Sequence, residues 1–136
     1  MGFEYINAGR LDGYMGASGV VIIDLREPEQ YAAAHFSGAI NVPYRQMEKL
    51  LDNSGYNNAG NDNGEYNRNG YGRGGYNRSG SLVINGNTYD RSTFFIFYCE
   101  RGSLSMIIGS RMSSMGYDAR TVVGGIRQYR GRNMVR

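Results

Sequence analysis

The chain has one cysteine, two prolines, one lysine and no tryptophan in 136 residues. A lone cysteine cannot form an intrachain disulfide, and it fits a reducing, intracellular compartment. No apolar run approaches the roughly 20 residues that a membrane-spanning helix needs. The first residues lack the basic and apolar regions of a signal peptide. We therefore expect a cytoplasmic protein with no membrane segment.

Length and charge limit the function classes further. A chain of this length predicts a single compact domain over residues 1–136. Its net charge is +3, and all basic residues except Lys49 are arginines. Arginine is the better planar partner for oxyanions, although codon or lineage bias explains the excess equally well.

Strand-like apolar runs alternate with segments of helical spacing along most of the chain. Residues Val20–Ile23 are all β-branched, which is typical of a strand buried on both faces of a parallel sheet. The alternation predicts an α/β fold in which about five parallel strands are flanked by helices. The predicted strands are 3–6, 20–23, 39–42, 94–98 and 119–123, and the predicted helices are 7–15, 29–34, one opening at Pro43, 103–115 and 126–129.

Three details of these elements are specific enough to test. Asn7 is expected to cap the first helix, and residues 35–38 are expected to form a turn. The fourth helix is expected to face the core through side chains at helical spacing. These side chains are Leu104, Ile107, Ile108, Met112 and Met115.

Residues 52–81 interrupt the pattern just before the predicted central strand. They contain eight glycines, eight asparagines and four tyrosines, with almost no aliphatic residue. Such a composition cannot bury enough apolar surface to offset the entropy of ordering, so we interpret the segment as a disordered insertion. After this segment, Asn85-Gly86 lies between strand-like residues and predicts a small hairpin over 82–89.

Cys99 is the candidate chemical centre. It ends the apolar run 94–98, and a glycine-bearing turn and a helix follow it. A strand that delivers a thiol to a helix N-terminus favours the thiolate, because N–H groups and the helix dipole converge there. The alternative is an inert buried cysteine, which is the commoner fate of a lone cysteine. The predicted active-site loop consists of Cys99, Glu100, Arg101, Gly102, Ser103 and Leu104.

The residues around Cys99 have different predicted roles. Gly102 would let the loop fold tightly, and Arg101 would attract an anion or remain a solvated side chain. Glu100 opposes ionisation of the thiol. Asp24 and Arg26, which follow the strand 20–23, are expected to support the loop together with Ser105. His35 is interpreted as a structural hydrogen-bonding residue.

The motifs taken together resemble the rhodanese-like domain family. The residues that carry the resemblance are Asp24-Leu-Arg26-Glu-Pro-Glu29-Gln-Tyr31, His35-Phe-Ser-Gly38-Ala-Ile-Asn41-Val-Pro43, Tyr98-Cys99-Glu-Arg-Gly102-Ser-Leu-Ser105, Met115-Gly116-Tyr117 and Gly124-Gly125-Ile126. The resemblance implies a five-stranded parallel sheet with an active-site cysteine after the central strand. It also implies transfer of sulfane sulfur through a Cys99 persulfide, from a small donor or a persulfidated protein to a thiol or cyanide. Neither a cofactor nor a metal is required.

Other functions remain open at this point. Leu104 departs from the arginine or threonine common at that position in the family, which favours slow thiosulfate turnover or a regulatory protein-binding module. A phosphatase is disfavoured, because Tyr98 replaces the usual histidine and no arginine closes the loop. Arginine and tyrosine alternate in residues 66–78 as in some RNA-binding segments. The near-neutral charge of the insertion disfavours nucleic acid as a partner.

Overall fold

A computed structural model describes residues 4–53 and 81–136, so the predicted insertion lies outside the described residues except at its ends. The chain divides into two compact units, residues 1–44 with 93–136 and residues 45–92. Within the described ranges, no helix is both long and apolar enough to cross a bilayer. The single-domain organisation stays a prediction.

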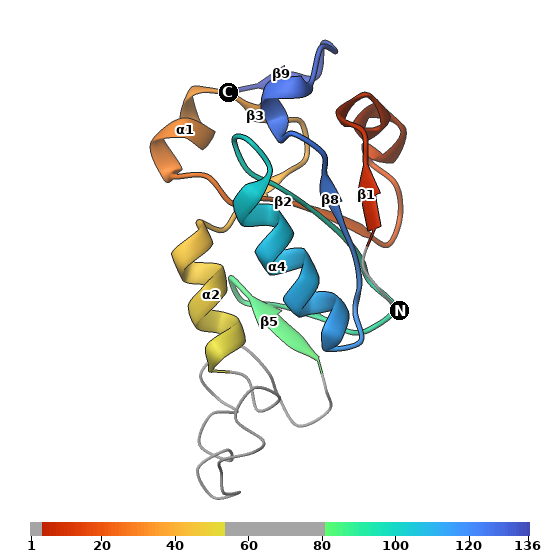
Figure 1. Ribbon diagram of the computed structural model, residues 1–136, viewed down its shortest axis with the longest axis vertical. Helices are drawn as coiled ribbons and strands as arrows, with labels where there is room; N and C mark the ends of the chain where they lie inside the picture. The colour runs from red at the N-terminus through yellow and green to blue at the C-terminus, as the bar shows by residue number, and fades with distance from the viewer. Residues whose placement is uncertain (1–3, 54–80) are drawn as a thin grey trace, which may run out of the picture. The chain divides into compact units, whose positions relative to one another are not determined.

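The first unit is built on a five-stranded sheet whose neighbouring strands are all parallel (Figure 1). This confirms the predicted α/β fold and sheet. The strand order is β1-β8-β7-β2-β4, so the strand before Cys99 is the central one. The strands are β1 (Glu4–Ile6), β2 (Val20–Asp24), β4 (Ile40–Asn41), β7 (Phe94–Tyr98) and β8 (Asp118–Val122).

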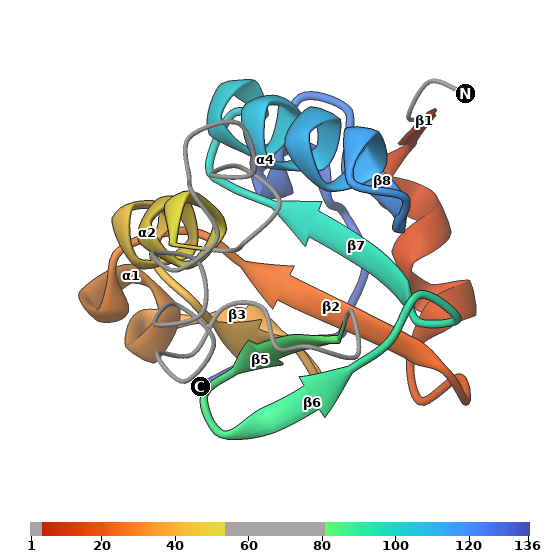
Figure 2. The same cartoon turned by 90° about the horizontal axis from the view of Figure 1, so that it is seen from below.

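Alternate side chains of the sheet enter two separate apolar layers. Ile96 and Tyr98 of β7 join a buried cluster that includes residues of η1 (Ala8–Tyr14) and η3 (Ile126–Gln128). Phe95 and Phe97 point the opposite way, and their rings stack with centroids 5.8 Å apart. The helix α4 (Ser103–Ser114) packs against β7 and β8 (Figure 2). The central strand is therefore buried on both faces, as its continuous apolar sequence predicts.

The helix α4 presents a different face to the core than the sequence predicts. Ile108 and Met112 are buried as expected, but Leu104 and Ile107 are 37% and 46% exposed. Ser105 and Gly109 are buried instead. Small residues let the helix approach β7 and β8 closely, and this tertiary contact overrides the apolar spacing.

Two further expectations were wrong in detail. The segment 7–15 forms a 3-10 helix, and Asn7 stands at its N-cap position without a side-chain hydrogen bond. Within the predicted turn 35–38, β3 (His35–Phe36) pairs antiparallel with β9 (Met134–Val135). A contact between segments about 100 residues apart leaves no local signal in the sequence.

The helix α1 (Pro28–Ala33) follows β2 and begins with a capping box. The Glu27 side chain accepts from the backbone of Gln30, and the Gln30 side chain accepts from the Glu27 amide at 3.0 Å. Proline at the first helical position fits because its missing N–H has no partner in the helix.

The second unit contains most of α2 (Tyr44–Asp52) and a hairpin of β5 (Leu82–Ile84) and β6 (Asn87–Tyr89). Asn85 and Gly86 both have positive φ, 51° and 85°, as the turn of a two-residue hairpin requires. The predicted hairpin is therefore confirmed. Asp52, at one end of the predicted insertion, is the last residue of α2.

Candidate active site

Cys99 is the residue that follows β7, at the carboxyl end of the strand, and its side chain is directed into the turn that precedes α4. Its Sγ accepts hydrogen bonds from the Gly102 amide at 3.1 Å and the Ser105 amide at 3.4 Å. The residue is 3% exposed. Two backbone donors therefore meet at the one thiol of the chain, and a negatively charged sulfur would be stabilised there.

Gly102 makes this geometry possible. It occupies the N-cap position of α4 with φ 104°, a conformation that side chains of L-residues rarely adopt. A Cβ on Gly102 would also lie 3.1 Å from the Gly124 amide nitrogen. The glycine thus satisfies both the turn and the close approach of a second backbone segment.

That second segment is the turn Gly124-Gly125, and the residues after the turn form hydrogen bonds with the backbone of the Cys99 loop. The amide of Ile126 donates to the Cys99 carbonyl at 2.9 Å, and the amide of Arg127 donates to the Glu100 carbonyl at 3.3 Å. In the sequence, Gly124-Gly125 carried only part of the family resemblance, and this scaffold role was not predicted. Two adjacent glycines after a strand were the available signal.

Ser105 and Thr121 fix the first turn of α4 to the neighbouring strand. Their hydroxyl oxygens lie 2.5 Å apart, and Ser105 Oγ also donates to the Gly102 carbonyl at 3.1 Å. Both residues are fully buried. Ser105 therefore contacts the loop in two ways, through its amide at Sγ and through its hydroxyl at Gly102.

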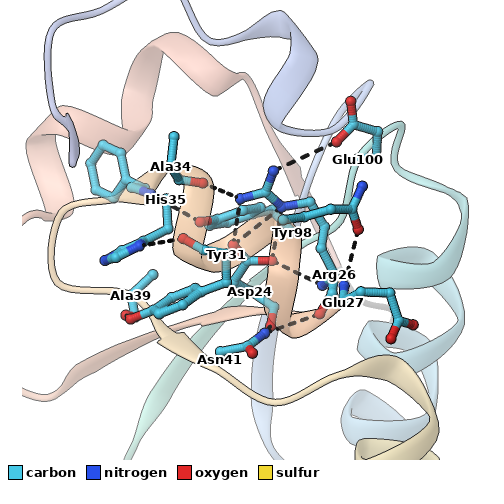
Figure 3. A network of polar contacts seen from close by, with 12 residues as sticks. Asp24, Arg26, Glu27, Tyr31, Ala34, His35, Ala39, Asn41, Tyr98 and Glu100 are labelled. Atoms are coloured by element: carbon cyan, nitrogen blue, oxygen red, sulfur yellow. Dashed lines mark hydrogen bonds and ion pairs between the residues drawn. The ribbon is translucent and has the colours of Figure 1, made fainter. Parts of the chain in front are cut away.

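Asp24 and Arg26 form a buried pair beside the loop (Figure 3). Arg26 Nη2 lies 2.8 Å from the Asp24 carboxylate, and Arg26 also donates to the Ala34 carbonyl at 2.6 Å. On its other side, Arg26 Nη1 lies 3.6 Å from Glu100. Burial would lower the pKa of Arg26, but the hydrogen bond and charge of Asp24 raise it above its ordinary value. Arg26 thus connects the end of β2 to the residue that follows Cys99.

Tyr98 anchors the strand end immediately before Cys99. Its hydroxyl accepts from the Phe36 amide at 3.0 Å, and its ring lies under the Arg26 guanidinium at 5.7 Å. Burial raises the pKa of the Tyr98 hydroxyl, and the nearby charge of Asp24 raises it further. Tyr98 therefore stays protonated and structural at neutral pH.

His35 also lies near this strand end, and it makes its contacts with Tyr31. Its ring stacks on Tyr31 with centroids 3.7 Å apart, and Nδ1 lies 2.9 Å from the Tyr31 carbonyl oxygen (Figure 3). Residues 4–53 and 81–136 contain no cluster of three or more His, Cys, Asp or Glu side chains suited to a metal ion.

The remaining predicted loop residues face outward. Arg101, Ser103 and Leu104 are exposed, while Glu100 is partly buried. Arg101 and Ser103 line a hollow of about 250 Å³ beside the loop, and Leu104 is absent from its lining. The structure thus brings all predicted loop residues, with Asp24, Arg26 and Ser105, to the carboxyl ends of β2 and β7.

Solved structures share this fold at low sequence identity. A rhodanese-related protein of Thermoplasma volcanium is 17% identical with a TM-score of 0.61, and 98% of each chain is covered. A human single-domain sulfurtransferase is 18% identical with a TM-score of 0.54, covering 93% of this chain and 95% of that one. At such identities the likeness shows the fold.

The chain also matches one part of a larger protein. Reduced Bacillus anthracis CoADR-RHD is 16% identical with a TM-score of 0.59, and the match covers 93% of this chain but 16% of that one. No curated protein matches the chain in sequence. The sequence model of the rhodanese-like domain matches residues 7–132. The chain that builds this cysteine loop therefore belongs to the rhodanese-like domain family.

Proposed function

We propose that the protein is a sulfurtransferase that carries sulfane sulfur as a persulfide on Cys99. The observation that carries this proposal is the pair of amide donors, from Gly102 and Ser105, at Cys99 Sγ. Donors that favour a thiolate would equally favour the anion of a sulfur bound to it. No cofactor is needed for this chemistry.

The reaction is a double displacement. The Cys99 thiolate attacks the outer sulfur of a donor such as thiosulfate, the S–S bond of the donor breaks, and sulfite leaves with the electron pair. This yields Cys99–S–S⁻. An acceptor nucleophile then attacks the outer sulfur; cyanide leaves as thiocyanate, and a thiol leaves as a persulfide. The Cys99 thiolate is restored, so the cysteine is a covalent carrier.

The support around the loop suits a carrier that must keep one geometry. Arg26 joins the carboxylates of Asp24 and Glu100, while the backbone amides that follow the Gly124-Gly125 turn bind the loop backbone. Arg26 also pairs with the carboxylate of Glu100, the residue after Cys99. This ion pair reduces the repulsion between Glu100 and anionic donors. We infer that the donor is a small sulfur compound or a persulfidated protein, and that the protein works in the cytoplasm, where its cysteine stays reduced.

Intact mass spectrometry tests this function. The protein is incubated with thiosulfate, or separately with inorganic polysulfide, and freed of donor. We expect a gain of one sulfur atom in the unmodified protein and none in Cys99→Ala or in protein alkylated beforehand. If neither donor loads Cys99 while the protein stays folded by circular dichroism, the carrier role is contradicted.

The second candidate is a rhodanese-like module that binds a partner with little turnover. The observation that favours it is Leu104, an exposed apolar side chain in the first turn of α4. It provides no hydrogen bond to a small oxyanion. Steady thiocyanate production from thiosulfate separates the two candidates, because the binding module would load slowly and show no sustained turnover.

A further inference from the structure

Three hollows adjoin one another beside the Cys99 loop. They measure about 250, 350 and 450 Å³, and Gly124 lines all three. The first and second share Arg101, the first and third share Val123, and the second and third share Gln128. The shared lining residues place the three hollows next to one another at the carboxyl ends of β1 and β8, and we call this row of hollows the Gly124 groove.

The two ends of the Gly124 groove differ in chemistry. One end is lined by apolar side chains that the fold leaves exposed, with Tyr5 at 51%, Met106 at 43% and Val123 at 47%. The other end is lined by Arg101 and Arg127, and Arg127 is half exposed. The acidic neighbour Glu100 lies 3.6 Å from Arg26 and 4.0 Å from Arg127, so its charge is shared. The groove therefore combines an apolar end with a net basic one.

The groove adjoins the sulfur site through backbone contacts. Gly102 lines it and donates its amide to Cys99 Sγ at 3.1 Å. Gly124 also lines it and packs directly against Gly102, since a Cβ on Gly102 would meet the Gly124 amide nitrogen at 3.1 Å. A molecule bound in the groove is thus next to the loop that holds the thiol.

We propose, as a deepening of the sulfurtransferase function, that the Gly124 groove binds an extended peptide segment of the sulfur acceptor. The segment has a cysteine thiol, an apolar residue for the end at Tyr5 and Met106, and acidic residues for Arg101 and Arg127. Charge complementarity selects the acidic residues. Two of the hollows, at about 350 and 450 Å³, fall within the usual range of a ligand pocket, roughly 300–1,000 Å³, and the third is smaller at about 250 Å³. The combined volume of the three hollows is larger than thiosulfate or cyanide would fill.

Cys99 itself is not among the residues that line the three hollows, and the proposed transfer takes place at the outer sulfur of its persulfide. The peptide thiol gives its proton to the outer sulfur of Cys99–S–S⁻, and the peptide sulfur attacks that outer sulfur. The bond between the two sulfurs of the Cys99 persulfide breaks, and the electron pair stays on Cys99. The products are the peptide persulfide and the Cys99 thiolate, so no oxidant or reductant is consumed. Arg101 and Arg127 act as binding residues in this scheme.

Binding is measured first, without any sulfur chemistry. A fluorescein-labelled octapeptide with one serine in place of cysteine, one leucine and two glutamates is titrated into Cys99→Ala protein by anisotropy. We expect a Kd at least tenfold lower than for the same peptide with two lysines. Arg127→Glu should reverse this preference. Arg132→Glu changes the net charge equally but does not line the groove, and it should keep the preference. Equal affinities for both peptides, or an equal effect of Arg132→Glu, would overturn the proposal.

Transfer is measured second, with persulfide-loaded wild-type protein. The cysteine form of the acidic peptide should discharge Cys99 at least tenfold faster than glutathione at the same thiolate concentration. If Cys99 loads and glutathione discharges it as fast as the peptide, the peptide proposal fails and the carrier function stands. If Cys99 never loads, the carrier function fails, and the binding titration still decides whether the groove takes an acidic peptide.

Discussion

Replacing Gly125 by alanine should damage the sulfur site far more than it damages the fold. Gly125 has φ 78°, and a Cβ there would lie 2.3 Å from the Glu100 carbonyl oxygen and 2.6 Å from the Arg101 amide nitrogen. Real Cβ atoms essentially never come within 3.0 Å of such atoms. The loop would therefore retreat by about 0.7 Å, and a displacement of about 1 Å can cost ~100-fold in rate.

The matched control is Gly16→Ala. Gly16 has φ 73°, and a Cβ on it would meet nothing within 4 Å. Both substitutions place a side chain at positive φ, with a cost of about 1–2 kcal/mol at Gly16. Gly125 also has ψ −175°, a conformation essentially confined to glycine, which costs about 1–3 kcal/mol. Only the substitution at Gly125 also pushes on the Cys99 loop.

The assay is the rate at which thiosulfate loads Cys99, followed by intact mass, with urea unfolding measured in parallel. We expect Gly125→Ala to load about 10- to 100-fold more slowly than the unmodified protein. Gly16→Ala should load at the unmodified rate while losing about 1–2 kcal/mol of unfolding free energy. Normal loading by a folded Gly125→Ala protein would refute the scaffold role of the turn.

Three other substitutions, with Arg120→Ala as the control for the first, test the surroundings of the loop. Arg26→Ala leaves the Asp24 carboxylate buried without its partner and should cost about 3–5 kcal/mol in urea unfolding. Arg120→Ala removes exposed pairs and should cost less than about 1 kcal/mol; equal losses would contradict the buried pairing. Tyr98→Phe should cost about 1–3 kcal/mol at pH 7. Because the folded pKa of Tyr98 lies above the ordinary value of 10.0, stability should fall as the pH rises past that value, and less steeply in Tyr98→Phe during alkaline unfolding. Leu104→Arg should increase thiocyanate production from thiosulfate by supplying an anion-binding group, and unchanged turnover would exclude Leu104 as the cause of slow turnover.

Most of the sheet could be predicted because its strands carry their own signals. The β-branched run of β2 and the aromatic run of β7 lie at the predicted positions, as does the hairpin turn at Asn85-Gly86. These patterns depend on residues close together in the chain, where hydrophobic periodicity and turn chemistry act directly.

The errors come from contacts between distant segments. Apolar spacing in α4 favours Leu104 and Ile107 as core residues. In the structure the small residues Ser105 and Gly109 are buried instead, and the Ser105 hydroxyl bonds to Thr121 of β8. The backbone hydrogen bond from Ile126 to the Cys99 carbonyl likewise joins segments with no local relation. The Cys99 loop and the glycine pair Gly124-Gly125 could both be located from sequence, but the contact between these two segments could not.

A single-turnover discharge tests the central claim most directly. Protein is loaded with sulfur, freed of donor and mixed with cyanide. The amount of thiocyanate formed per protein chain is measured, and the intact mass is followed. We predict one thiocyanate for each loaded chain, a return to the original mass, and no thiocyanate from Cys99→Ala. Thiocyanate from Cys99→Ala, or a loaded Cys99 that keeps its sulfur in excess cyanide, would contradict the role of Cys99 as a sulfur carrier.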